Sequence, residues 1–435
     1  MPRGRSLCSQ TFAVNDRGDT MLKLTIALAL LALLAAGERE SYENYRVFRV
    51  TPTSDEQTSF LHYLSENSHE YNFWNGPSQT NVPADLMVAP DGIEDFENLM
   101  NAADLPYSTY IENVQRLIDT ENPPLWKASS GFDWTSYHTL EEINAYLHKV
   151  AEDHPDKVEV VYAGKTYEKR DIVGVKVSFK QNNPGVFIEG GIHAREWISP
   201  ATVTYLLNEL LTSQNPEIRQ MAESNDWYIF PVLNPDGFVY THTKNRLWRK
   251  SRQPFRVCNG VDLNRNWGYK WMHGGASSNP CSETYAGTSA FSSVETATMS
   301  KYITSVSDKI YAFISFHSYS QLLLFPYGHT REHLDNYDEM YGVAKKTVEA
   351  LAKRYGTQYR YGNIAETIYV ATGSSVDWAK AVLNFPLSYT YELRDTGKYG
   401  FVLPARLIVP TAEETMDSLV AFFKESTARG IPQRL

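Results

Sequence analysis

From residue 136 onward, the apolar residues follow two alternating patterns. Short apolar runs of strand length lie between segments in which apolar residues recur at helical spacing. The runs are 158–162, 171–177, 186–188, 227–232, 310–316 and 387–391, and the helical segments include 140–151, 294–306, 336–354 and 411–427. This alternation predicts an α/β domain, in which helices cover both faces of a sheet. The functional site of such a sheet lies at the carboxyl ends of its strands.

Residues 41–116 have shorter elements. Strand-like patterns at 45–50, 73–74 and 84–88 are interleaved with helical patterns at 54–67 and 93–103, and 107–114 fits a last strand or helix. This order predicts a small ferredoxin-like α+β unit. The unit carries no cluster of catalytic residue types.

The next segment, 117–135, is rich in residues that interrupt helices. Pro123 and Pro124 follow polar residues, and Ser129, Ser130 and Gly131 come soon after. We expect no helix over 118–124, and we expect the segment to be an exposed connector that proteases can cut. A site-free unit followed by such a connector suggests a zymogen, and a permanent two-domain protein is the alternative.

The N-terminus contains one long apolar run, Leu24 to Ala36. The run is shorter than the roughly 20 residues that span a bilayer, and small residues end it. It predicts a secretory signal peptide over 21–37, preceded by an upstream extension over 1–20, with a buried helix as the alternative. We therefore expect a secreted, extracellular protein without a membrane anchor, built from the small α+β unit and connector over 38–127 and the α/β domain over 128–435.

Charge and cysteine content narrow the function. The formal net charge of −10 argues against nucleic acid as a partner. Of three cysteines, Cys8 precedes the signal, which leaves Cys258 and Cys281 in the exported protein. An even pair in an oxidising compartment predicts one disulfide, with two buried thiols as the alternative.

Candidate metal ligands stand where three of the apolar runs end. His193 and Glu196 follow the run 186–188 at a predicted helix start, His317 follows 310–316, and Glu392 follows 387–391. Two histidines and one glutamate can bind a catalytic zinc ion, and the second carboxylate can act as a general base. Each residue alone is more often a surface or core residue, so the joint placement carries the interpretation.

Several arginines lie between Glu196 and His317 in the chain. Arg265 lies beside Asn264, and a guanidinium next to an amide suits the capture of a carboxylate. Solvated surface charge is the alternative for any single arginine.

Taken together, these stretches resemble the secreted zinc metallocarboxypeptidases of the pancreatic carboxypeptidase A/B type. The resemblance covers nearly everything from Tyr45 to the C-terminus and rests on specific motifs, which are GIHAREWISPA (191–201), PVLNPDGF (231–238), TKNRLWRKSR (243–252), GVDLNRNW (260–267), FHSYSQLLLFPYG (316–328), IYVATGSSVDW (368–378) and YELRDTGKYGF (391–401).

The resemblance implies one zinc ion per chain, held by His193, Glu196 and His317. This ligand set is already established for carboxypeptidase A. It further implies that Glu392 takes a proton from the attacking water and passes it to the leaving amine, and that Arg249 polarises the scissile carbonyl.

The resemblance also implies how a substrate is bound. Asn264, Arg265 and Tyr369 would hold the terminal carboxylate, and Arg195 and Tyr319 would line neighbouring peptide subsites. Anchoring that carboxylate would place the last peptide bond over the metal, which makes the enzyme an exopeptidase for peptide and protein C-termini.

The same resemblance assigns the remaining features. Cys258 and Cys281 match the family disulfide, and residues 38–127 match the inhibitory activation domain. A trypsin-like protease would cut after Lys127, with Arg116 as the second choice. We expect a monomer.

Specificity in this family depends on the position of Val376, where an acidic residue goes with Lys or Arg substrates. Val376 is apolar and predicts A-type specificity for aromatic and bulky aliphatic C-termini, with Gly328 leaving room for a ring. The matching pocket positions are also uncharged: Ile364, Leu324, Ala371 and Thr390. The alternatives are that Asp377 faces the pocket, a B-type or broad-specificity enzyme, an inactive binding protein on the same fold, and a zinc acylase.

Overall fold

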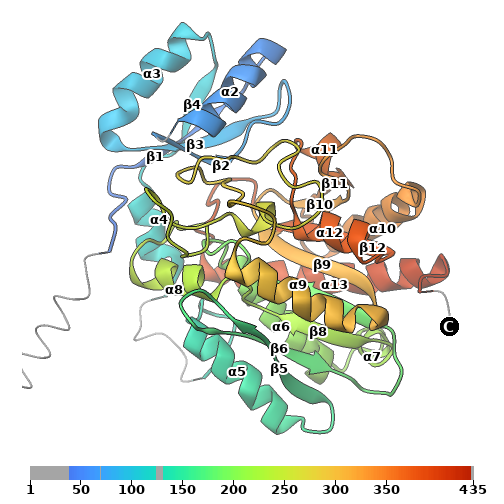
Figure 1. The fold of residues 1–435 in the computed structure, drawn as a ribbon. Coiled ribbons are helices and arrows are strands. Elements are labelled where there is room, and N and C mark those ends of the chain that lie inside the picture. Colours follow the sequence, from blue (N-terminus) through green and yellow to red (C-terminus); the bar gives the residue numbers. More distant parts are fainter. Residues whose placement is uncertain (1–38, 69, 124–130, 433–435) are drawn as a thin grey trace, which may run out of the picture. The chain divides into compact units, whose positions relative to one another are not determined.

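The computed structural model describes residues 39–68, 70–123 and 131–432 (Figure 1). The expected signal segment 21–37 and the expected cleavage residue Lys127 lie outside these ranges. Residues Ser41–Leu435 form one compact unit, which contains two sheets.

The smaller sheet belongs to the N-terminal part of this unit. Its strands are β1 (Arg46–Val50), β2 (Tyr71–Asn75), β3 (Ala84–Val88) and β4 (Tyr107–Ile111), in the spatial order β2-β3-β1-β4. All three strand pairs are antiparallel. Helices α2 (Asp55–Asn67) and α3 (Ile93–Ala102) complete the predicted βαββαβ order, with a strand rather than a helix at 107–111.

Alternation along β1 gives this sheet two apolar faces. Phe48 packs in a core with Leu61 of α2 and Phe96 of α3. The neighbouring Val47 belongs to a different apolar cluster, which contains Leu247 and Phe401 from the C-terminal part of the chain. The small sheet is therefore covered by its own helices, α2 and α3, on one face. On the other face it is covered by the C-terminal part of the chain, which contains the larger sheet and is called the larger domain below.

The connector prediction is wrong at its first residues. Helix α4 (Val114–Glu121) continues through a stretch that we expected to be irregular. Asn113 caps the helix by accepting a hydrogen bond from the Arg116 backbone, and Glu121 at its end is buried. The cap and the buried contact stabilise the helix. The prolines do not interrupt it, because they follow only after the helix has ended.

The larger sheet has eight strands in the order β11-β10-β12-β9-β7-β8-β6-β5. Their bounds are β5 (Val158–Lys165), β6 (Asp171–Val177), β7 (Gly185–Glu189), β8 (Asp226–Phe230), β9 (Ile310–Ser318), β10 (Leu322–Phe325), β11 (Arg360–Asn363) and β12 (Leu387–Leu393). The central neighbours β12, β9, β7 and β8 are parallel, whereas β10–β12, β8–β6 and β6–β5 are antiparallel. The predicted mixed, largely parallel sheet is confirmed.

Helices cover both faces of this sheet, as predicted (Figure 1). One core joins the sheet to α5 (Leu140–Asp153), α6 (Ile198–Thr212), α7 (Pro216–Glu223), α10 (Tyr337–Tyr355) and α13 (Ile408–Ala428). A second core on the opposite face includes α9 (Val294–Val306) and α12 (Ser375–Val382). Phe187 and Ile188, adjacent on β7, belong to the second and the first core respectively, because successive side chains of a strand point to opposite faces.

Candidate active site

The candidate ligands converge where parallel strands end. His193 and Glu196 lie in a turn between β7 and α6, where the Glu196 backbone N–H donates to the His193 carbonyl at 3.3 Å. The turn precedes the helix, which begins only at Ile198, so the expected position at the helix start is wrong by two residues. His317 is the eighth residue of β9, which pairs with β7.

Three buried side chains form a compact metal-ligand set. The Nδ1 atoms of His193 and His317 lie 3.1 Å apart. Glu196 Oε1 lies 2.8 Å from His193 Nδ1, and Glu196 Oε2 lies 3.1 Å from His317 Nδ1. Ligand atoms around a tetrahedral zinc ion are separated by about 3.3 Å. The donor types, their spacing and their burial therefore fit one zinc ion.

Asp262 orients this set and was assigned no role from the sequence. Its Oδ1 lies 3.0 Å from His193 Nε2, so the proton of this imidazole sits on Nε2 and the Nδ1 lone pair is available to a metal. Its Oδ2 accepts from Arg249 Nη2 at 2.8 Å and from Nε at 3.2 Å. Although burial opposes it, the charge of Arg249 and the hydrogen bond from His193 hold the pKa of Asp262 well below its usual value. A sequence signal existed, since Asp262 lies two residues before Asn264 in the same motif.

Glu392 reaches the site from β12. It is the register partner of His317 on the adjacent parallel strand. Burial raises the pKa of Glu392 to about 8, and the nearby Glu196 carboxylate adds to this shift. Its carboxyl group lines the same cavity as His193 and Glu196, so it is placed to exchange a proton with a group bound there.

The predicted carboxylate-binding residues also line this cavity, whose volume is about 100 Å³. Arg265 Nε and Nη1 donate to the backbone carbonyls of Gly275 and Asn264 at 2.9 and 3.0 Å. These contacts hold the guanidinium in place. Asn264 and Tyr369 line the same space, so the structure brings all three residues together.

An apolar pocket adjoins the carboxylate-binding residues. Val376 is buried there, and the other predicted pocket positions, Leu324, Ile364, Ala371 and Thr390, line the same cavity. Asp377, the alternative, is buried outside it and accepts a hydrogen bond from the Gly328 backbone at 2.8 Å. The alternative placement is therefore wrong.

The expected reason for Gly328 is also wrong. Gly328 does not line the cavity, and a Cβ at this position would lie 2.2 Å from the Ala371 carbonyl oxygen. Its backbone carbonyl accepts from the Ala371 N–H at 2.9 Å. The glycine permits close contact between two backbone segments.

The N-terminal domain, which is the part of the chain that contains the four-stranded sheet, closes one side of the cavity. Trp74, Asn75 and Gly76 line it together with His193 and Glu196, and the Trp74 ring lies 5.3 Å from that of Phe401. Both predicted subsite residues are engaged by this domain. The Tyr319 hydroxyl donates to Asp85 at 3.0 Å, and Arg195 Nη1 donates to Asn72 Oδ1 at 3.3 Å.

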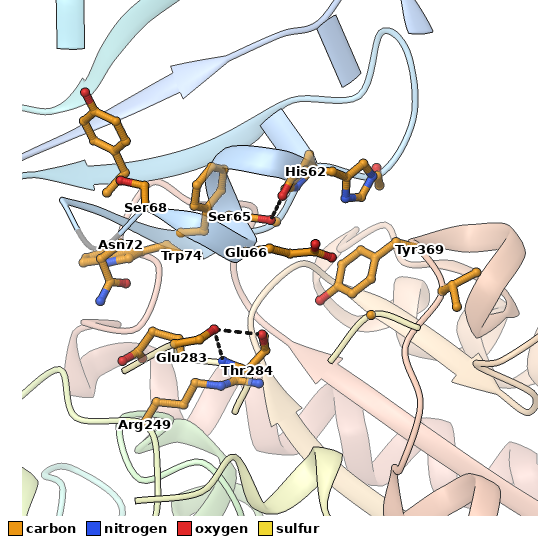
Figure 2. Close-up of a pocket in the computed structure, with 18 of the residues that line it drawn as sticks. His62, Ser65, Glu66, Ser68, Asn72, Trp74, Arg249, Glu283, Thr284 and Tyr369 are labelled. Carbon is orange, nitrogen blue, oxygen red and sulfur yellow. Dashed lines mark hydrogen bonds between the residues drawn. The ribbon is translucent and has the colours of Figure 1, made fainter. Parts of the chain in front are cut away.

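A second, larger cavity of about 400 Å³ lies between the domains (Figure 2). His62, Glu66 and Trp74 face it from the N-terminal domain, and Arg249 and Tyr369 face it from the other side (Figure 2). The space beside the site is thus narrowed by the N-terminal domain and remains partly open.

Helix α4 is attached to the same region by an ion pair. Arg246 Nε donates to Glu121 Oε2 at 2.7 Å, and its Nη2 contacts the other carboxylate oxygen. Arg246 also donates to the backbone carbonyls of Arg195 and Phe401, at 2.9 and 2.8 Å. The sequence pattern gave no sign of this pairing, because the two residues are 125 positions apart.

The predicted disulfide is present. Cys258 and Cys281 are bonded, with their Cα atoms 5.1 Å apart. The bridge closes a loop that contains Asp262, Asn264 and Arg265, so it restrains the segment that carries three residues of the site.

Comparison with known families matches both parts of the chain. Residues 143–418 match the family described as zinc carboxypeptidase, and residues 48–121 match the carboxypeptidase activation peptide. The structure described as the carboxypeptidase A of Helicoverpa armigera superposes with a TM-score of 0.82 at 28% identity, covering 90% of this chain and 99% of that one.

Individual relatives are similar over nearly their whole length. Zinc carboxypeptidase A 1 of Anopheles gambiae is 48% identical over 412 residues, which are 93% of this chain and 95% of the relative. Carboxypeptidase A1 of Bos taurus is 39% identical over 402 residues, 89% of this chain and 96% of the relative.

Proposed function

Because the chain belongs to the zinc carboxypeptidase family, we propose that it is a secreted digestive zymogen whose processed form releases aromatic and bulky aliphatic residues from peptide C-termini. The observation that carries the specificity is the uncharged pocket around Val376, which opens beside Asn264 and Arg265. A charged side chain would be buried there without a partner, at a cost of several kcal/mol.

In this proposal, the residues around the cavity place the scissile bond. Arg265 and the Asn264 amide bind the terminal carboxylate, with Tyr369 beside them, and the terminal side chain enters the Val376 pocket. An internal peptide bond has no carboxylate at this position, so only the last bond is aligned.

His193, Glu196 and His317 would hold the zinc ion. When bound, zinc supplies Lewis-acid chemistry, which polarises a carbonyl and lowers the pKa of water. Asp262 keeps the His193 proton on Nε2, so that Nδ1 stays available as a ligand.

Glu392 moves the proton in this mechanism. It accepts a proton from the attacking water and then donates it to the nitrogen of the departing residue, which leaves as a free amino acid. Arg249, fixed by Asp262, offers positive charge to the carbonyl oxygen as negative charge develops on it.

The N-terminal domain keeps the chain inactive before processing. Trp74 to Gly76 occupy one side of the cavity, while Asp85 and Asn72 engage the two subsite residues, Tyr319 and Arg195. A trypsin-like protease would cut after Lys127 and release this domain.

Among the described residues, no helix is long and apolar enough to cross a membrane.

The experiment is a C-terminal release assay on the full chain before and after trypsin. We expect zinc to copurify at one ion per chain and peptides ending in Phe or Leu to lose that residue after processing. Release of Lys in preference to Phe would contradict the specificity. Absence of any release from the processed, zinc-loaded protein would favour a binding protein on this fold.

A further inference from the structure

A buried carboxylate that takes no part in this mechanism lies beneath the active site. Glu189 is the last residue of β7, four positions before His193, and it is fully buried. We propose that Glu189 is a positioning residue for the substrate's terminal carboxylate, and that it acts through Ser375 on the Asn264 amide. This inference rests on the proposed role of Asn264.

One carboxylate oxygen of Glu189 accepts hydrogen bonds from two hydroxyl groups. Its Oε1 accepts from Ser315 Oγ at 2.8 Å and from Ser375 Oγ at 2.6 Å. Ser315 is its register partner on the neighbouring strand β9, whereas Ser375 is the first residue of α12. The carboxylate therefore joins two central strands to the start of the helix that carries Val376.

Ser375 connects Glu189 to Asn264 through two hydrogen bonds. Its backbone N–H donates to Asn264 Oδ1 at 3.1 Å, so one residue holds Glu189 with its hydroxyl and Asn264 with its amide. An N–H group can pair only with the oxygen of the Asn264 side chain. The contact therefore directs Oδ1 toward α12 and turns the NH₂ group of Asn264 the other way.

The orientation of this amide matters for the ligand. A substrate carboxylate only accepts hydrogen bonds, so it is attracted by the Asn264 NH₂ and repelled by Oδ1. An amide that could rotate freely would present the wrong atom part of the time. Fixing Ser375 removes that freedom before the substrate arrives, which lowers the entropic cost of binding.

A buried carboxylate destabilises the fold more than a neutral side chain would if its role were only structural. Burying a carboxylate is costly unless it is paired, and its Oε2 has no hydrogen-bond partner among the described residues. The donors on Oε1 are two neutral hydroxyl groups rather than an arginine or lysine. Polar groups that weaken a fold in this way are typical of functional positions.

The test compares Glu189→Ala, Glu189→Gln and Ser375→Ala in the full chain after trypsin processing. Calorimetry would measure binding of 3-phenylpropanoate and of its neutral amide, 3-phenylpropanamide. We expect the preference for the carboxylate to fall roughly three- to tenfold in Glu189→Ala and Ser375→Ala, the value of one or two ordinary hydrogen bonds. Zinc content should stay at the wild-type level.

Two further variants separate positioning from general damage. Glu189→Gln keeps an acceptor oxygen for both hydroxyls and should retain most of the preference. Ser388→Ala removes a buried serine hydroxyl that has no hydrogen-bond partner among the described residues. Ser388 lies on β12, which pairs with β9, and this variant should bind both ligands as the wild type does. The double variant Glu189→Ala/Ser375→Ala should lose no more than either single one, because the two residues act in one chain of contacts.

Kinetics on an N-blocked dipeptide ending in Phe give an independent readout. KM should rise by a similar factor while kcat changes less, because ground-state and transition-state binding of the carboxylate weaken together. Equal losses for the acid and the amide ligand, or an unchanged ratio in Ser375→Ala, would overturn the proposal. Failure of the wild type to release Phe would refute the proposed function, whereas the ligand ratio would still decide the role of Glu189.

Discussion

Glu121 at the end of α4 and Arg246 form a buried ion pair that joins the activation segment to the larger domain. Both side chains are almost inaccessible to solvent, with exposures of 3% and 6%. Arg246 also binds the carbonyls of Arg195 and Phe401, so the pair is attached to the backbone of two site segments.

We predict that Glu121→Gln weakens the inhibited state. Removing one partner of a buried pair leaves an uncompensated charge, at a cost of about 3 kcal/mol. The uncut variant should therefore hydrolyse a small Phe substrate faster than the uncut wild type, and trypsin should process it sooner. Substrate hydrolysis during limited digestion measures both effects.

The control is Glu112→Gln, because the Glu112 side chain is 78% exposed and lies 3.8 Å from Arg46. This variant should behave as the wild type. After a cut at Lys127, processed Glu121→Gln should equal processed wild type, since Glu121 leaves with the released segment. An uncut Glu121→Gln protein with wild-type background activity would show that the pair is not part of the inhibition.

A second prediction concerns proton transfer. Glu392→Gln removes the base without changing the size of the side chain, and general acid–base groups contribute about 10²- to 10⁴-fold. We expect kcat to fall by that factor while zinc content and KM stay near wild type. Steady-state kinetics with metal analysis checks this, and the exposed Glu349→Gln is the control. Turnover close to wild type would remove Glu392 from the role.

A third prediction addresses metal retention. Asp262→Asn keeps the shape of the side chain but removes the charge that binds His193 Nε2 and Arg249. Loss of such a partner typically lowers metal affinity about 10- to 100-fold. Competition with a chelator should release zinc from this variant at proportionally lower chelator concentration, and added zinc should restore the metal content.

Asp417→Asn is the matched control for that experiment, because Asp417 pairs with Arg354 at the surface of α13, away from the site. It should hold zinc as the wild type does. Equal zinc retention in the Asp262 and Asp417 variants would mean that His193 is oriented by other contacts.

Hydrophobic periodicity was sufficient to predict most of the fold. Helix α9 matches its predicted range of 294–306, and strand β6 matches 171–177, because both have strong internal patterns. The rule that sites lie at strand ends placed His193, His317 and Glu392 together, and β7, β9 and β12 are indeed parallel.

What the sequence did not predict depends on contacts between distant residues. Helix α4 was missed because part of its stability comes from Glu121 binding Arg246, which no local pattern reveals. Gly328 was misinterpreted because its neighbour, Ala371, comes from another loop. Asp262 was overlooked because the orientation of a ligand is visible only when the imidazole and the carboxylate can be seen together.

The last prediction concerns the specificity pocket. For the wild type, kcat/KM for a peptide ending in Phe should exceed that for Lys by more than about 100-fold, because an unpaired ammonium group in the Val376 pocket costs several kcal/mol. Val376→Asp supplies a carboxylate at this buried position. It should lower activity on Phe and raise activity on Lys, since the ammonium group would now be paired.

Val382→Asp is the matched control, because Val382 ends the same helix α12 but is 47% exposed. This variant introduces the same charge outside the pocket and should keep the wild-type preference for Phe. A panel of four peptides ending in Phe, Leu, Lys and Glu distinguishes the outcomes. If Val376→Asp and Val382→Asp changed the Phe-to-Lys ratio equally, net charge rather than the pocket would be responsible, and the assignment of Val376 would be wrong.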